Sequence, residues 1–336
     1  MKGICIGLGV RGRWWTRFAA EAGIEVVGVV DPVEETRHAA AKEMQIPESI
    51  QFPSVAEAVA ATRAEVATVC TPNPTHAAVI HECLDVGLHT LVEKPMVESP
   101  EDAASVMEKA KSKCLHLAVA QNYRYTPMAQ ALWSAVKGGR VGRVATVQIV
   151  FSRWRPARGL YLPLMLNQAI HQFDMVRLVL QTDPTWCFAR SWNPTWSPTD
   201  GPCVLEAMWG MGHVSGNSDE PEMIFSFSGN YVTAGTQTPY NGQWRIEGER
   251  GRIETVGNDE GQRAFLQHRE TNETIELPLG KGDGSEAQVC RAFLEAIREG
   301  RPAPTESTDN IRSLAMCWAA DRSSREHRVV PMNEYF

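Results

Sequence analysis

Residues 3–12 of the 336-residue chain read GICIGLGVRG, a short apolar run followed by three glycines spaced as G-x-G-x-x-G. Glycines at these positions allow a tight strand-to-helix turn and let backbone amides approach a phosphate at the start of the helix. Asp31 follows the next apolar run, EVVGVV at 25–30, where a dinucleotide-binding turn requires an acid. The alternative is two ordinary strand-to-helix turns. The position of the motif predicts a Rossmann βαβ unit at the start of the chain.

A dinucleotide in this unit would contact the glycine turn and Asp31. The carboxylate of Asp31 can accept hydrogen bonds from the ribose hydroxyls of adenosine and would repel a 2′-phosphate. We therefore expect NAD rather than NADP as the cofactor. The loop residues expected to contact it are Gly7, Gly9, Val10, Arg11 and Gly12.

The first 120 residues continue to alternate between strand and helix patterns. Apolar strands are predicted near 66–69, 89–92 and 115–120, and helices near 11–22, 33–44, 76–86 and 100–113. Nearly continuous apolar strands separated by helices indicate a parallel sheet covered on both faces. The pattern predicts an α/β domain over residues 1–121.

The pattern of predicted strands and helices changes after residue 121. Strand-like segments predominate at 144–151, 223–229, 231–237, 244–257 and 273–279, with helical patterns at 127–137, 164–180, 286–299 and 308–322. The polar stretch 210–222 is predicted to be a surface loop. Residues 122–336 are therefore expected to form an α+β domain on a mostly antiparallel, open sheet.

The composition excludes several classes of protein. Apolar residues make up 43% and charged residues 22% of the chain, and the net charge is −7. A basic surface for nucleic acid or anionic membranes is not expected, and no apolar run is long enough to span a bilayer. The eight cysteines form no C-x-x-C pair, and the N-terminus does not read as a signal peptide. We expect a cytoplasmic protein without a metal site.

Two polar turns follow the predicted strands at 66–69 and 89–92. The first, TPNPTH at 71–76, should border the cofactor, because ligands bind at the carboxyl ends of parallel strands; it can also be read as a turn in which Thr75 caps a helix. The second, Glu93-Lys94-Pro95, places a lysine at the same edge. A partly buried lysine beside a cationic nicotinamide could take a proton from a substrate hydroxyl. A simple Lys-Pro turn is the alternative.

The helical pattern at 164–180 carries three polar residues on an apolar background. Asn167, His171 and Asp174 stand at i, i+4 and i+7 and are expected on one helix face. Buried polar groups in this arrangement are costly unless they meet partners or a ligand. They indicate either a substrate site or a satisfied polar network in the core.

These elements, in this order, resemble the Gfo/Idh/MocA family of NAD(P)-dependent sugar and cyclitol oxidoreductases over essentially the whole chain. The most specific part is Glu93-Lys94-Pro95, placed after the glycine turn, Asp31 and TPNPTH and followed by QNYR at 121–124. The resemblance implies a Rossmann domain and a second domain whose open sheet often forms an oligomer interface. A homodimer or homotetramer is expected.

The resemblance also implies roles for individual residues. Lys94 would be the catalytic lysine, followed by a peptide bond that is often cis, and His171 and Asp174 match the histidine and last acid of a D-x-G-x-H-x-x-D helix. Asn167 replaces the first acid of that motif and Ala169 its glycine. Because asparagine can orient a hydroxyl but cannot accept its proton, proton transfer would fall to Lys94 and His171.

The resemblance also implies further site residues. The cofactor site is expected to include Thr71, Pro72, Asn73, His76, Glu93, Lys94 and Asn122 as well. The substrate site is expected to include Lys94, Tyr123, Arg124, Trp154, Arg155, Asn167, His171 and Asp174, with Tyr240 as a further candidate. Tryptophan beside arginine, as at 152–155, suits a sugar ring, although a surface turn is an alternative.

We therefore expect an NAD-dependent oxidoreductase that transfers hydride between nicotinamide and a secondary alcohol of a sugar, sugar derivative or cyclitol. One alternative is an enzyme that retains NAD and uses transient oxidation for elimination or glycoside cleavage. Another is a dinucleotide-binding sensor without turnover. Such sensors typically lack the lysine or the histidine, and here both Lys94 and His171 are present.

The assignment of Asp31 can be tested by the substitution Asp31→Ala. We expect the Kd for NAD to rise by about tenfold or more, because hydrogen bonds between a carboxylate and the ribose hydroxyls are lost. The Kd for NADP should change less. Calorimetric titration with each dinucleotide measures both values, and an unchanged affinity for NAD would refute the assignment.

Overall fold

The computed structural model describes residues 1–155, 163–212 and 223–335. Within these ranges the chain divides into two compact units, one of residues 1–122 with 284–311 and one of residues 123–283 with 312–336. The first boundary lies next to the one expected from sequence. Residues 284–311 differ from the expectation, because they return to the first unit.

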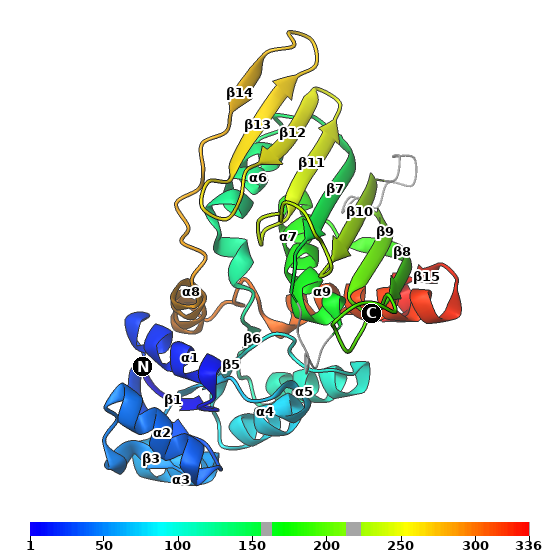
Figure 1. Ribbon diagram of the computed structural model, residues 1–336. Coiled ribbons are helices and arrows are strands. Elements are labelled where there is room, and N and C mark those ends of the chain that lie inside the picture. The colour runs from blue at the N-terminus through cyan, green and yellow to red at the C-terminus, as the bar shows by residue number, and fades with distance from the viewer. Residues whose placement is uncertain (156–162, 213–222, 336) are drawn as a thin grey trace. The chain divides into compact units, whose positions relative to one another are not determined.

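The first unit is built on a parallel sheet of six strands in the order β3-β2-β1-β4-β5-β6 (Figure 1). The strands are β1 (Lys2–Ile6), β2 (Glu25–Val30), β3 (Gln51–Phe52), β4 (Val66–Val69), β5 (His89–Val92) and β6 (Leu117–Val119). The strand order and the parallel pairing confirm the predicted Rossmann domain. The two-residue β3 was not predicted, because it is too short to show a pattern.

Helices follow the strands of the first unit. They are α1 (Val10–Glu21), α2 (Glu34–Met44), α3 (Val55–Thr62), α4 (His76–Asp85), α5 (Pro100–Ser112) and α8 (Glu286–Glu299), with short 3-10 turns at η1 (Glu48–Ile50) and η2 (Asn73–Thr75). A further 3-10 turn, η3 (Asn122–Tyr125), begins at Asn122 and continues into the second unit. Local chemistry sets their starts. At α5, for example, the Ser99 hydroxyl accepts a hydrogen bond from the Asp102 amide and Pro100 occupies the first turn.

The second unit holds a nine-stranded sheet in the order β14-β13-β12-β11-β7-β10-β9-β8-β15. Its strands are β7 (Val144–Ser152), β8 (Pro184–Trp192), β9 (Val204–Met211), β10 (Met223–Asn230), β11 (Gln243–Gly248), β12 (Gly251–Val256), β13 (Arg263–His268), β14 (Thr274–Glu276) and β15 (Val330–Pro331). All neighbours are antiparallel except β7 and β10. The mostly antiparallel sheet confirms the predicted fold class.

The helical elements of the second unit are α6 (Pro127–Lys137), η4 (Met165–Ala169), α7 (Ile170–Leu180), most of α9 (Ser307–Glu326) and the short turn η5 (Met332–Glu334). One face of the sheet is buried, and β10 alternates buried and half-buried residues along its length. Phe173 of α7 meets that face, where its ring lies edge-on to Trp209, Phe225 and Phe227. This aromatic cluster fixes α7 on the sheet.

Two sequence expectations for the second unit differ from the structure. Residues 231–237 were predicted to be a strand but are irregular, because β10 ends at Asn230 and the Asn230 side chain accepts a hydrogen bond from the Val232 amide. A surface loop was predicted at 210–222. Its first two residues, Gly210 and Met211, belong to β9, and residues 213–222 lie outside the described residues.

The carboxylate of Glu93, the first residue after β5, joins several parts of the first unit. One of its oxygens accepts from Arg11 Nε at 2.7 Å and from Trp15 Nε1 at 2.9 Å, and the other from the Lys94 amide at 2.8 Å. Arg11 also pairs with Glu286 at the start of α8. Burial alone would raise the pKa of Glu93, but the charges of Arg11 and Lys94 and the Trp15 hydrogen bond lower it below its ordinary value.

We expect Glu93→Gln to lower the free energy of unfolding at pH 7 by about 1–3 kcal/mol, because Arg11 and Trp15 then face an amide. The lowered pKa of Glu93 means that its stabilising effect is present above the ordinary glutamate value of about 4.3 and is lost as pH falls through the folded-state pKa. The difference from the wild type should therefore be constant from pH 7 to about pH 5 and shrink below about pH 4.

Denaturant unfolding at several pH values measures this difference. Glu43→Gln is the matched control, because the Glu43 carboxylate is half exposed and pairs with Arg13 and Arg17 at the surface. It should change stability much less than Glu93→Gln. If Glu93→Gln lowers the free energy of unfolding by the same amount at pH 3.5 as at pH 7, the charge of Glu93 does not contribute to stability.

Candidate active site

The glycine turn between β1 and α1 is closely packed at two positions and open at the third. Gly7 has a φ of +87°, and a Cβ there would lie 2.5 Å from the Cys70 carbonyl oxygen; a Cβ at Gly12 would lie 1.8 Å from the Gly7 carbonyl oxygen. Nothing lies within 4 Å of a Cβ at Gly9. Gly9 is the N-cap of α1 and its helix end has no side-chain capping bond. The turn therefore fits a pyrophosphate at the helix N-terminus.

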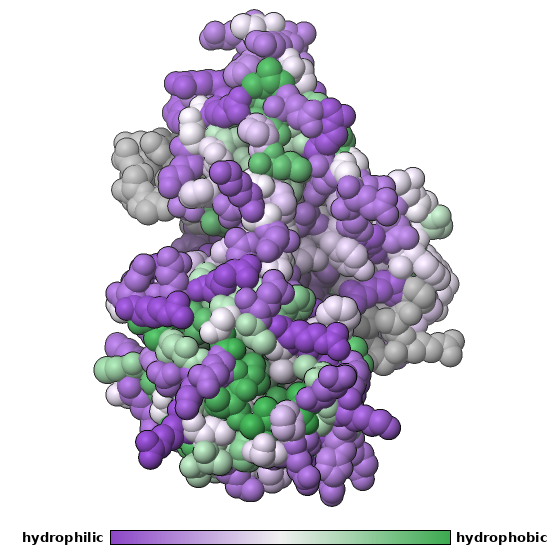
Figure 2. Space-filling view, turned by 90° about the vertical axis from the view of Figure 1, so that its left-hand side faces the viewer, coloured by the Kyte–Doolittle hydropathy of each residue, from purple (hydrophilic) through white to green (hydrophobic). Residues whose placement is uncertain are grey.

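Apolar surface lies beside this turn. Val10 and Trp14 of α1, and Val33 just before α2, are each more than half exposed. Figure 2 shows hydrophobic residues gathered on one face of the first unit, in the lower part of the view. An anion-binding turn next to apolar surface suits a ligand that has both phosphates and flat rings.

Asp31 lies at the end of β2 and faces the glycine turn. One carboxylate oxygen accepts from the Leu8 amide at 2.8 Å and the other from the Val33 amide at 2.9 Å. Each oxygen keeps acceptor capacity for a hydroxyl group. Arg37 donates to the Asp31 carbonyl oxygen at 2.6 Å and was not expected at this site, because a lone arginine in a helix carries no sequence signal.

The turn at 71–76 is held by its own side chains. The Thr75 hydroxyl donates to the Pro72 carbonyl oxygen at 2.7 Å and lies 2.9 Å from the Thr71 hydroxyl, so it does not cap α4. His76 is fully buried, with Nδ1 2.8 Å from the Pro95 carbonyl oxygen and Nε2 3.0 Å from the Thr71 carbonyl oxygen. His76 was expected to contact the cofactor, but the structure places its ring between two carbonyls of neighbouring loops.

Lys94 follows β5 and is anchored through its backbone on both sides. Its amide donates to Glu93, and the carbonyl of the next residue, Pro95, is held by His76. The Lys94–Pro95 peptide bond is cis, as the resemblance implied. Asn122, expected at the cofactor, uses its side-chain amide to donate to the Gly284 carbonyl oxygen at 2.9 Å.

The polar helix of the second unit begins with a π turn. Asn167 lies in η4, a π-helical segment, whereas His171 and Asp174 lie in the α-helical α7. The expected single α-helical face therefore applies to the last two residues only. π turns occur often at functional sites. The His171 ring stacks on Tyr123, with ring centroids 4.1 Å apart and an angle of 13° between the planes.

Asp174 and Arg124 were both expected to bind substrate, and the structure pairs them with each other. The Asp174 carboxylate accepts from Nε and Nη2 of Arg124, the latter at 2.8 Å, and from the Ser313 hydroxyl at 2.8 Å. Asp174 is 1% exposed. This is the satisfied polar network that the sequence left open as an alternative.

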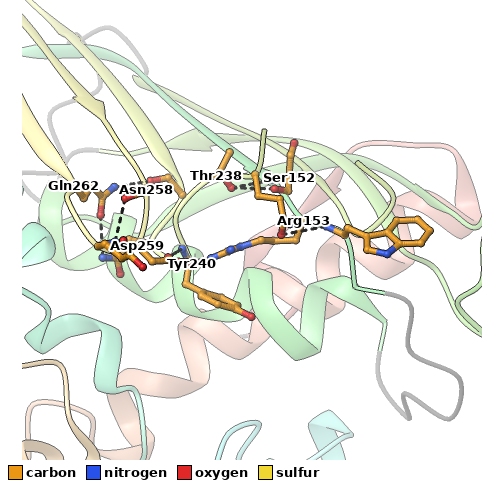
Figure 3. Close-up of polar contacts among 12 residues, drawn as sticks. Ser152, Arg153, Thr238, Tyr240, Asn258, Asp259 and Gln262 are labelled. Carbon is orange, nitrogen blue, oxygen red and sulfur yellow. Dashed lines mark hydrogen bonds and ion pairs between the residues drawn. The ribbon is translucent and has the colours of Figure 1, made fainter. Parts of the chain in front are cut away.

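The segment after β7 contains a second polar cluster (Figure 3). The Arg153 guanidinium lies 3.8 Å from the centre of the Tyr240 ring and pairs with Asp259, which also accepts from the Tyr240 amide at 2.7 Å. Asp259 was not expected, because it lies about a hundred residues further along the chain in a loop without a motif. Trp154 and Tyr240 remain 49% and 42% exposed.

Tyr240 also forms hydrogen bonds with η4 and α7. Its carbonyl oxygen accepts from Gln172 Nε2 at 2.6 Å and from Gln168 Nε2 at 3.4 Å. Arg155, expected at the substrate, lies with its guanidinium 5.7 Å from the centre of the buried Tyr231 ring. Aromatic rings and hydrogen-bonding side chains therefore lie on the same unit as Asn167 and His171.

The described residues contain neither a metal cluster nor a membrane-spanning helix. In these ranges no group of three or more histidine, cysteine or acidic side chains could hold a metal ion. Likewise, none of the helices that the structure describes is both long and apolar enough to cross a bilayer.

Known proteins similar to this chain agree with the fold. An uncharacterized protein of Sinorhizobium fredii is 25% identical over 99% of this chain and 96% of its own length. An inositol 2-dehydrogenase of Rhizobium meliloti is 24% identical over 83% of this chain and 88% of its own. An oxidoreductase from Agrobacterium radiobacter, solved in complex with NAD+, L-tartaric acid and magnesium, has a TM-score of 0.84 at 18% identity, covering 100% of this chain and 99% of that one.

Two family models match consecutive parts of the chain. Residues 3–121 match the oxidoreductase family with an NAD-binding Rossmann fold, and residues 129–254 match the GFO/IDH/MocA C-terminal domain. The two matches together cover more than two thirds of the sequence. The chain therefore belongs to the Gfo/Idh/MocA oxidoreductase family, and its first unit contains the family's NAD-binding Rossmann domain.

Proposed function

We propose that this protein is an NAD-dependent dehydrogenase of a secondary alcohol in a sugar, sugar derivative or cyclitol. The observation that carries the proposal is the fixed backbone of Lys94, which follows β5, an interior strand of an NAD-binding domain. It is held by Glu93 on one side and, through Pro95, by His76 on the other. An amine fixed at the carboxyl end of a parallel strand suits acid–base work beside a dinucleotide.

The proposed roles follow the chemistry of each side chain. When bound, NAD supplies the hydride acceptor. Lys94 accepts the proton of the substrate hydroxyl, and His171 takes part in that proton transfer. Asn167 orients the hydroxyl, because an amide donates and accepts hydrogen bonds but does not take up a proton at neutral pH.

The choice of NAD over NADP rests on Asp31. Its carboxylate is fixed by the amides of Leu8 and Val33 and retains the lone pairs needed for two ribose hydroxyls. A negative charge held there disfavours a 2′-phosphate. Arg37 is bonded to the Asp31 carbonyl oxygen, which directs part of its donor capacity away from a phosphate.

A sugar or cyclitol substrate is supported by the second unit and by the relatives. Exposed Trp154 and Tyr240 offer aromatic faces to the apolar C–H face of a ring, and Arg155 and Asn167 offer donors to its hydroxyls. The Rhizobium meliloti relative is an inositol 2-dehydrogenase. We also propose a homodimer or homotetramer, as the family resemblance implies.

The proposal is tested by incubating the purified protein with NAD, and separately with NADP, across a panel of sugars, sugar acids, glycosides and inositols. We expect NADH absorbance near 340 nm to rise with at least one alcohol. Lys94→Ala should lower kcat by about 10²–10⁴-fold, because the group that accepts the proton is lost. Lys111→Ala, which removes an exposed lysine of α5, is the matched control and should leave kcat unchanged.

Two results would contradict this function. A Lys94→Ala variant as active as the wild type would remove the lysine from the mechanism. No absorbance change with any alcohol, although NAD binds tightly, would favour an enzyme that retains NAD through its cycle or a sensor without turnover.

A further inference from the structure

Two adjacent residues of η3 hold two residues of α7. Tyr123 stacks on His171, and Arg124 forms a two-pronged bond with Asp174. His171 and Asp174 are three positions apart in the helix, so their side chains lie on the same face. A segment of two residues therefore contacts one helix face at two points about one turn apart.

The Arg124–Asp174 contact is buried and satisfied. The side chain of Arg124 is 10% exposed and that of Asp174 is 1% exposed. The Ser313 hydroxyl, which donates to Asp174, accepts in turn from Arg177 Nη1 at 2.8 Å. A bidentate arginine–carboxylate pair fixes both distance and orientation, and the partner charge occupies the guanidinium. Arg124 is therefore not available as a clamp for an anionic substrate.

The Tyr123 contact complements this pair. Burial raises the pKa of Tyr123 to about 12. The phenol is therefore neutral at physiological pH, and no phenolate is present to accept a proton from the substrate. Its hydroxyl accepts from Gln168 Nε2 at 3.3 Å, and Gln168 lies in η4, three residues before His171. Tyr123 thus contacts the π turn through its hydroxyl and the following histidine through its ring.

The start of α7 adjoins an irregular turn of helix. Ala169, the residue before α7, has helical backbone angles (φ −62°, ψ −25°), so α7 continues directly from the π turn η4. A π turn changes the helical repeat, so the direction of the side chains after it depends on tertiary contacts as well as on the backbone. The contacts from η3 supply such a constraint next to His171.

We propose that Tyr123 and Arg124 are positioning residues that fix the plane of the His171 imidazole, rather than substrate-binding residues. This inference rests on the proposed function, in which His171 takes part in proton transfer. Through its bond to Asp174, Arg124 fixes the rotation of α7 about its axis and the position of α7 along that axis. Tyr123 then limits the imidazole to rotamers that stack on the phenol ring.

The stack can be tested without turnover, by NMR of protein with isotope-labelled histidine. His171→Asn identifies the His171 signals among the nine histidines. Stacking on an aromatic ring shifts ring protons upfield, so we expect Tyr123→Leu to move the His171 signals downfield by about 0.5 ppm or more, whereas Tyr123→Phe should keep most of the upfield shift. Phe188→Leu, an exposed site on β8, is the control and should leave them in place. Unmoved His171 signals in Tyr123→Leu would overturn the proposal.

Kinetics then separate positioning from substrate binding. We expect Tyr123→Leu to lower kcat by about 10- to 100-fold with KM for the alcohol changed less than about threefold, since a misaligned group costs rate and not ground-state binding. Tyr123→Phe should recover most of the lost kcat. Arg124→Lys, which keeps the charge but not the two-pronged bond, should lower kcat by about tenfold. A rise in KM at unchanged kcat would show direct substrate binding and overturn the proposal.

The two experiments distinguish failure of this inference from failure of the proposed function. If the wild type oxidises no alcohol but the His171 signals move as expected in Tyr123→Leu, the stack is supported and the proposed function is at fault. If alcohol is oxidised and Tyr123→Leu keeps the wild-type kcat, the inference is overturned and the function stands. Circular dichroism of each variant verifies that it is folded.

Discussion

The buried carboxylate of Glu93 constrains much of the first unit. A carboxylate removed from water is costly unless charged and hydrogen-bonding partners surround it. Arg11, Trp15 and the Lys94 amide meet this requirement, and Arg11 in turn meets Glu286. One electrostatic requirement therefore connects the glycine turn, the lysine loop and α8, which helps to explain why residues 284–311 return to the first unit.

Much of the fold could be predicted from the sequence because its signals are local. Apolar runs marked five of the six parallel strands, and Asp31 marked the end of β2. Three features left no local signal that distinguishes them. The strand β3 has two residues, the π turn at η4 shares the apolar pattern of the helix after it, and residues 231–237 read as a strand although the Asn230 side chain turns the chain.

The candidate site was predictable in its residue types but not in its partners. Sequence reasoning selected His76 from a turn at the carboxyl end of a strand, Arg124 from the QNYR segment of the family resemblance, and Asp174 as a polar residue on an apolar helix. The structure shows that all three also meet protein groups, and those groups lie up to 139 positions away in sequence. Such pairings depend on tertiary structure, and for the same reason Asp259 beside Arg153 could not be foreseen.

An ion pair between an arginine and a buried carboxylate lies near each proposed catalytic residue. Arg11–Glu93 adjoins Lys94 in sequence, and Arg124–Asp174 lies within one helical turn of His171. Apolar residues of similar volume could stabilise a protein core equally well, because desolvation offsets most of the attraction within a buried pair. What apolar packing does not provide is the directional geometry of an arginine–carboxylate contact, which is two-pronged at Arg124–Asp174. If Lys94 and His171 act in catalysis, the orientation of their side chains matters more than the net contribution of these pairs to stability. This explains why charged groups that are costly to bury lie next to them.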